Sequence, residues 1–172
     1  MDAVDERAGV SKATIYRWRL TSEALALDAL HQQWDTARPP LRGTGCMRGD
    51  LLALLRPWVG LVSQRLYGRV TAALLTAAHT DPAFAEQYRT HFAAPRREQG
   101  RTIFRRSIER GEIAADTEVE VALDLLYGPL YQRLWHGHAP LNERFVRDVV
   151  DTVVDGLTTV PDGGRSPEYQ AG

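Results

Sequence analysis

The stretch that decides the fold is AGVSKATIYR, which runs from Ala8 to Arg17. Gly9 follows a short segment of helical character, and glycine readily takes the left-handed conformation that ends a helix. Two residues later, Ser11 is a favoured N-cap for a second helix, and the apolar Val10 between them can anchor the turn on a core. The pattern predicts two short helices joined by a tight turn.

The side chains that would point outward from the second helix suit the major groove of DNA. Lysine and arginine contact phosphates or guanine, alanine and threonine can contact thymine methyl groups, and a tyrosine hydroxyl can hold a phosphate. The same geometry also occurs as an ordinary corner between two helices of a bundle, so the turn alone leaves both interpretations open. The candidate DNA-contacting residues are Ser11, Lys12, Ala13, Thr14, Tyr16, Arg17 and Arg19.

The composition is that of an ordinary globular chain. It has 172 residues with 44% hydrophobic and 25% charged residues and a net charge of −1, so any DNA contact must come from a local basic patch. The single cysteine, Cys46, excludes an internal disulfide. The polar, acidic N-terminal residues are unlike a signal peptide, and no apolar run approaches the ~20 residues of a membrane span. We therefore expect a cytoplasmic protein with no membrane segment.

Apolar residues recur at three- and four-residue spacings along the rest of the chain, which predicts an all-α fold. Prolines and glycines between residues 38 and 48 are typical of a domain boundary. We expect an N-terminal helix-turn-helix head over residues 1–38, a helical body over 47–158, and a disordered tail over 159–172.

Capping residues and helix breakers divide the body further. Asp50 is predicted to cap a helix that contains Pro57, and Gly68 is predicted to separate that helix from the next. Gly111 and Gly137 are predicted to end later helices.

The string from Ala8 to Arg17, with TSEAL following at 21–25, resembles the DNA-binding signature of the TetR family. The segments DPAF at 81–84, APRR at 94–97, ERGEI at 109–113 and DLLYGPLY at 124–131 resemble its C-terminal ligand domain. The resemblance implies a homodimer with a three-helix DNA-binding head and a ligand-sensing, dimerising body. It also implies a regulator, a repressor in the family's usual manner, which binds a pseudo-palindromic double-stranded DNA operator and is released by a small molecule.

Family members carry an amphipathic helix ahead of the segment that here starts at Met1. By this resemblance the head is incomplete, with its first helix absent. The alternative function is therefore a helical ligand-binding or dimerising protein that has lost DNA binding through N-terminal truncation.

Chemistry of other kinds has little support in the sequence. No acid, base and nucleophile cluster is apparent, so we expect no enzymatic activity and no cofactor. His136 and His138 stand one residue apart, which suits a helix end better than a metal site, and we expect no metal.

Aromatic residues cluster in the middle of the chain, near prolines that kink helices and leave gaps between them. One interpretation is an aromatic core; the other is a pocket for a small, mostly apolar ligand. The candidate pocket residues are Trp58, Tyr88, Phe92, Phe104, Tyr127 and Tyr131.

The last two helices carry more apolar side chains than one body of this size is expected to bury. The excess favours a four-helix interface between two copies. The candidate interface residues are Leu123, Leu126, Leu130, Leu134, Phe145, Val149, Val150 and Val153.

Overall fold

The computed structural model describes residues 22–37 and 43–158, so the candidate DNA-contacting residues and the tail lie outside the described residues. The described helices are α3 (Ser22–Ala37), α4 (Met47–Val62), α5 (Arg65–Thr80), α6 (Pro82–Tyr88), the π-helical segment η1 (Arg89–Ala93), α7 (Ala94–Glu109), α8 (Val119–His136) and α9 (Glu143–Leu157). Within these ranges the only β-type pairing is an isolated bridge between Ile113 and Thr158. The predicted all-α fold is confirmed.

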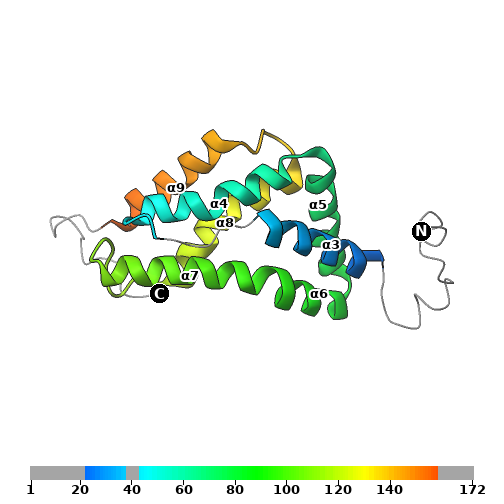
Figure 1. Ribbon diagram of the computed structural model, residues 1–172, viewed down its shortest axis with the longest axis horizontal. Coiled ribbons are helices and arrows are strands. Elements are labelled where there is room, and N and C mark those ends of the chain that lie inside the picture. Colours follow the sequence, from blue (N-terminus) through cyan, green and yellow to red (C-terminus); the bar gives the residue numbers. More distant parts are fainter. Residues whose placement is uncertain (1–21, 38–42, 159–172) are drawn as a thin grey trace, which may run out of the picture.

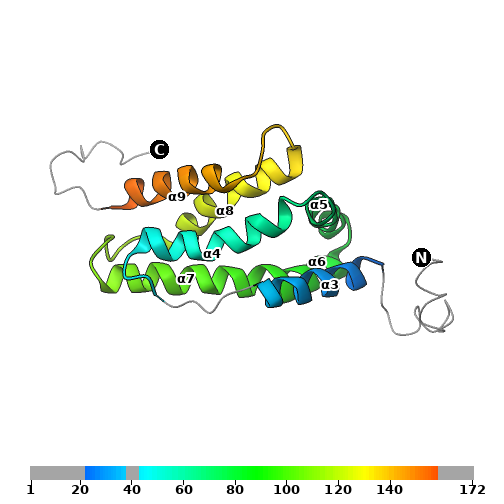
Figure 2. The same cartoon turned by 45° about the horizontal axis from the view of Figure 1, so that its top comes forward.

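Helix α4 is the centre of the arrangement. It packs against α9 on one side and α7 on the other, and it also contacts α3 and α5. Figure 2 shows α4 lying between α9 and α7. Helix α8 contacts both α7 and α9, while α3, α5 and α6 gather at the opposite end of the molecule from the C-terminus of α9 (Figure 1).

The start of α4 differs from the prediction, because Asp50 does not cap it. The N-cap is Cys46, whose sulfur accepts a hydrogen bond from the Gly49 amide. Asp50 is buried in the first turn, where its Oδ1 accepts bonds from the Thr44 amide at 2.5 Å and the Thr44 hydroxyl at 2.7 Å. Its carboxylate therefore ties the preceding loop to the helix.

The break between α4 and α5 also falls elsewhere than predicted. It lies at Ser63 and Gln64, and Gly68 is inside α5. A Cβ at residue 68 would lie 2.5 Å from the Val62 carbonyl oxygen, so glycine is needed here for the close approach of the two helices. The predicted ends at Gly111 and Gly137 are confirmed by their positive φ angles of 73° and 60°.

Helix α6, η1 and α7 follow one another without a loop. The wider π-type turn at 89–93 lies directly before Pro95, which has no amide hydrogen to donate. Proline is therefore accommodated by a local change of helix type. Turns of this kind are frequent at functional sites.

Two groups of buried apolar side chains hold the helices together. The larger, the main core, is built from α4, α7, α8 and α9 with Trp34 of α3. The smaller, the second core, joins α3, α5, α6 and η1 with Leu61 of α4, and it includes Leu27 and Leu30. Helix α3 therefore contacts both cores, and each of its buried large side chains contributes about 1.5–3 kcal/mol to its attachment.

Candidate functional site

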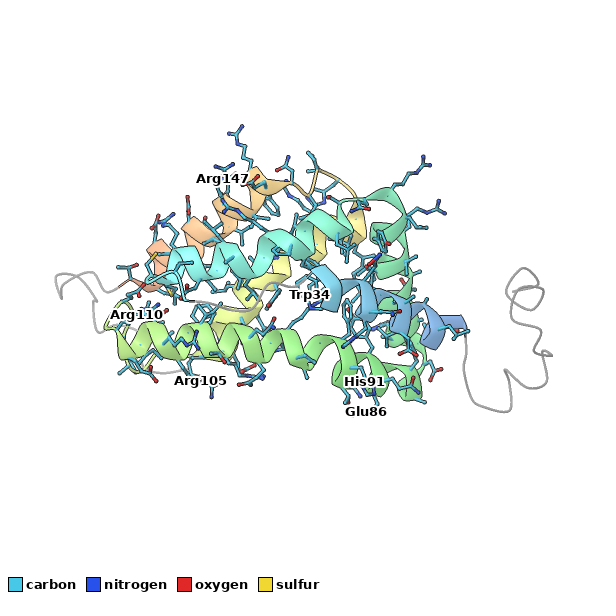
Figure 3. The ribbon with its side chains drawn as sticks, in the orientation of Figure 1. Trp34, Glu86, His91, Arg105, Arg110 and Arg147 are labelled. Carbon is cyan, nitrogen blue, oxygen red and sulfur yellow. The ribbon has the colours of Figure 1, made fainter. Side chains whose placement is uncertain are left out.

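Arg96, in the first turn of α7, lies where the main core and the second core meet. Its side chain is only 4% exposed. Its guanidinium carbon lies 3.6 Å from the ring centroid of Phe92, 4.5 Å from that of Trp34 and 5.5 Å from that of Trp58. We call these three rings the aromatic cage. Figure 3 shows Trp34 in the C-terminal part of α3, the helix that brings it to Arg96.

The guanidinium of Arg96 has no hydrogen-bond partner on any of its three nitrogens. Its sequence neighbour Arg97 is in the opposite situation, with Nη2 2.6 Å from Glu120 and Nη1 2.7 Å from Asp124. The buried arginine is thus the one without a carboxylate, although burial makes an unpaired charge costly.

Three further buried polar atoms near Arg96 lack partners. They are the indole nitrogen of Trp58, the hydroxyl of Tyr88 and the side-chain oxygen of Gln99. Tyr88 stacks on Phe92 with ring centroids 5.0 Å apart, which ties it to the cage. Unsatisfied buried polar atoms are rare in folded proteins, so three residues with unpaired donors and one with an unpaired acceptor mark a region that needs an explanation.

Arg96 and Tyr88 both keep the protons that they can donate. Burial lowers the pKa of Arg96, and the neighbouring Tyr131, Tyr88 and Tyr127 raise it. Arginine nevertheless stays charged in proteins, because its ordinary pKa is so high. Burial, with a smaller effect of Tyr131, raises the pKa of Tyr88 well above its usual range, so this phenol keeps its proton.

Only some of the predicted pocket residues lie around Arg96. Trp58, Tyr88 and Phe92 come together around Arg96, as described above. Tyr131 packs on Trp58 with ring centroids 5.3 Å apart, and the Tyr127 hydroxyl donates to the backbone carbonyl of Arg96 at 3.2 Å. Phe104 is fully buried in the main core, two turns further along α7, and belongs to the packing instead.

Sequence reasoning missed Arg96 and Trp34. One available signal was the four-residue spacing of Tyr88, Phe92 and Arg96, which places an arginine on the same helix face as two aromatic residues. Trp34 had no such signal, because it reaches the cage from a helix far away in the sequence.

A second feature is the outer face of α8 and α9. Leu125 is 55% exposed, and Val121 and Trp135 are similarly exposed on the same helix. A groove of about 400 Å³ runs between the two helices. Its lining residues are Leu125, Pro129, Phe145, Asp148, Val149, Thr152, Val153, Gly156 and Leu157.

The structure corrects part of the predicted interface. Four of the predicted side chains are fully buried inside one copy, where a partner cannot reach them: Leu123, Leu126, Leu130 and Val150. They contact the main core, which is larger than the sequence suggested. Leu134 is partly buried against the same core, whereas Phe145, Val149 and Val153 line the groove.

Residues 22–37 and 43–158 offer neither a membrane span nor a metal site. None of the helices there combines the length and the apolar character needed to cross a membrane. The same residues contain no group of three or more histidine, cysteine, aspartate or glutamate side chains placed to hold a metal ion.

Comparison with known proteins identifies the family. Residues 41–153 match the family described as the tetracyclin repressor-like, C-terminal domain. The chain is 34% identical over 157 residues to the uncharacterized HTH-type transcriptional regulator YdeS of Bacillus subtilis, which covers 91% of this chain and 78% of that protein. It is 30% identical over 171 residues to the DNA-binding transcriptional repressor TetR of Mycobacteroides abscessus, covering 96% of this chain and 85% of that protein.

The fold agrees with these sequence matches. The crystal structure of the TetR family transcription regulator SCO0332 resembles this structure with a TM-score of 0.75 at 36% sequence identity, over 92% of this chain and 86% of that one. The matched family covers most of the helical body, and the two relatives and the solved structure extend the match over almost the whole chain. The chain therefore belongs to the TetR family of transcriptional regulators.

Proposed function

We propose that this protein is a repressor that binds a pseudo-palindromic operator as a homodimer and leaves it when a small molecule binds the body. The observation that carries the proposal is membership of the TetR family, including a relative named as a DNA-binding transcriptional repressor. In this proposal residues 1–38 form the DNA-binding head, and the segment Lys12 to Arg17 contacts DNA in the major groove.

The outer face of α8 and α9 supports the dimer. Its groove is lined mainly by apolar side chains, and exposed leucine and valine residues adjoin it. Pairing this face with the same face of a second copy would make a four-helix interface with two-fold symmetry. The proposed contact residues are now Leu125, Pro129, Phe145, Val149, Val153 and Leu157.

The contacts of α3 support a connection between ligand and DNA. This helix is the last of the proposed head, and its Trp34 lies against Arg96 in the body. A ligand that changes the position of Trp34 would favour some orientations of α3 over others. Release from the operator then follows if the favoured orientation fits DNA less well.

DNA binding is the direct test of the proposed function. Fragments of DNA from around the protein's own gene are titrated with the full chain at low and moderate salt, with random DNA as the reference. We expect tight, salt-dependent binding to one fragment, weakened about 5- to 150-fold by Arg17→Ala if this arginine contacts a base. Arg105→Ala, on the far surface of the body, is the matched control. If no fragment binds more tightly than random DNA, the proposal is wrong.

A further inference from the structure

Several buried hydrogen-bond donors on and around Arg96 lack an acceptor. Three nitrogens of the guanidinium, the Trp58 indole N–H and the Tyr88 hydroxyl are all buried without a hydrogen bond of normal geometry. The Tyr131 hydroxyl lies near Arg96 and Tyr88 and raises the pKa of each, but a single hydroxyl cannot satisfy the five N–H bonds of a guanidinium. The unpaired donors come from α4, α6 and α7, so three separate elements converge on one place. Most of these atoms are donors only, which means that a group rich in acceptors would satisfy them together.

The rings of the aromatic cage do not replace the missing hydrogen-bond acceptor. The N–H bonds of a guanidinium lie in its plane, whereas a cation–π contact joins the charge to the face of a ring. Phe92 at 3.6 Å and Trp34 at 4.5 Å therefore hold the cation without accepting its hydrogen bonds. The N–H bonds of the guanidinium have no partner of normal geometry, and a planar, bidentate acceptor would suit them.

A purely structural role for Arg96 fits the rest of α7 poorly. Three other arginines of this helix meet carboxylates of the chain: Arg97 and Arg101 pair with Glu120, and Arg105 pairs with Glu98. An apolar side chain of similar volume would fill a buried position at lower free-energy cost than an unpaired charge. The cost at Arg96 is understandable if the missing carboxylate comes from outside the chain.

We propose that Arg96 binds the carboxylate of a small amphipathic ligand, with Trp58 and Tyr88 donating further hydrogen bonds to it. The aromatic cage and the adjoining Tyr131 would cover the apolar part of the same molecule. A single buried cation matches the single charge of a carboxylate better than the higher charge of a phosphate. This proposal rests on the proposed function only in treating that ligand as the molecule that releases DNA.

Ligand binding can be tested without DNA. The thermal midpoint of the full chain is measured with octanoate, decanoate and 4-phenylbutyrate, and with the primary amide of each acid. Since binding to the native state raises its stability, we expect at least one acid to raise the midpoint by several degrees and its amide to have little effect. Inorganic phosphate is tested in the same way. If phosphate raises the thermal midpoint and none of the acids does, the assignment to a carboxylate is overturned.

Variants distinguish a specific role of Arg96 in acid binding from the general effect of removing a positive charge. Arg96→Met keeps the length and apolar stem of the side chain, and we expect it to weaken acid binding by about 30-fold or more. Arg105→Met removes one positive charge from the exposed side of the same helix and should leave acid binding unchanged (Figure 3). Tyr88→Phe removes one donor and almost no volume, and it should weaken binding by about tenfold. Trp58→Phe should weaken binding at least as much, because it removes a donor and also leaves a cavity in the core.

Folding of the variants can be read from the same measurement. In the absence of acid, we expect Arg96→Met to melt at the same temperature as the wild type or higher, because it removes an unpaired buried charge. A lower midpoint for Arg96→Met, together with no acid-dependent shift in the wild type, would show that Arg96 is a packing residue and overturn the proposal. Equal shifts with acids and amides would overturn it as well.

Failure of this proposal is distinguishable from failure of the proposed function. If an acid binds through Arg96 but leaves DNA affinity unchanged, the carboxylate site stands and its role in release is wrong. If a specific DNA fragment binds but no acid in the panel does, the repressor stands and the carboxylate site is wrong.

Discussion

Arg110, at the end of α7, directs its guanidinium at the buried carboxylate of Asp50 in α4, with Nη2 3.5 Å from Oδ2. The same carboxylate accepts two hydrogen bonds from Thr44, and the Met47 amide next to it donates to Glu112 at 2.6 Å. The first turn of α4 and the last turn of α7 are therefore joined through polar contacts at one end of the bundle.

Replacing Asp50 by alanine should reduce the free energy of unfolding by about 1–3 kcal/mol, since the Thr44 amide loses its acceptor and the site loses a paired charge. Asp50→Asn keeps one acceptor oxygen and should lose less. Both are measured by urea denaturation, with Asp116→Ala in an exposed turn as the control. If Asp50→Ala unfolds at the same urea concentration as the control, the carboxylate is not holding this corner.

Glu120 predicts a pH dependence of stability. Hydrogen bonds and charge from Arg101 and Arg97 lower its pKa from 4.5 to about 2 in the folded protein. A carboxyl whose folded pKa lies below its unfolded pKa stabilises the protein above the unfolded value, and this contribution is lost as the pH falls through the folded value. The gap in thermal midpoint between wild type and Glu120→Gln should therefore be present at pH 6 and shrink steadily between about pH 5 and pH 2.

The effect of Glu120 should be small, because the ion pairs are exposed to solvent and screened by salt. Glu109→Gln, an exposed carboxylate at the end of α7, is the matched variant and should give a smaller gap at pH 6. A gap for Glu120→Gln that stays constant down to pH 2 would contradict the role assigned to its two arginines.

Two glycines of neighbouring helices should respond in opposite directions to alanine. At Gly68 the new methyl group would meet the backbone carbonyl of Val62, and the helices would have to separate, at a cost of about 1–3 kcal/mol. At Gly60 nothing lies within 4 Å of the new Cβ, so alanine should stabilise α4 by up to about 1 kcal/mol. Chemical denaturation of both variants checks the pair, and a loss of stability in both would rule out the steric explanation.

The proposed dimer can be tested at Leu125. Arginine there would place a charge in the groove between α8 and α9, and we expect the mass in solution to fall from that of a dimer to that of a monomer. Leu66→Arg is the control, since Leu66 is even more exposed, at 69%, and lies on α5. Sedimentation equilibrium gives the masses, and dimers that persist equally in both variants would exclude this face as the interface.

Local features of the fold could be predicted from the sequence because their causes are local. Gly111 and Gly137 end helices, as predicted, through their own backbone conformation. Asp50 and Gly68 were misassigned because their roles depend on Thr44 and Val62, which reach them only through the folded arrangement of helices.

The functional sites were predicted less completely, for a similar reason. Helix α8 carries leucines on several of its sides, so periodicity could not tell that Leu126 faces the main core and Leu125 faces solvent. Arg96 looks like a surface residue in the sequence, next to three other charged or polar residues. Its burial depends on Trp34 and Trp58, which belong to helices separated from it by dozens of residues.

Helix α3 is held at three points along its length. Leu27 and Leu30 are fixed in the second core, and Trp34, four residues after Leu30, is fixed in the main core. At about 1.5 Å per residue, Leu27 and Trp34 lie about 10 Å apart along the helix axis. Because these contacts belong to one continuous helix, a displacement of Trp34 beside Arg96 would strain the second core as well, and the whole of α3 would have to respond as one body.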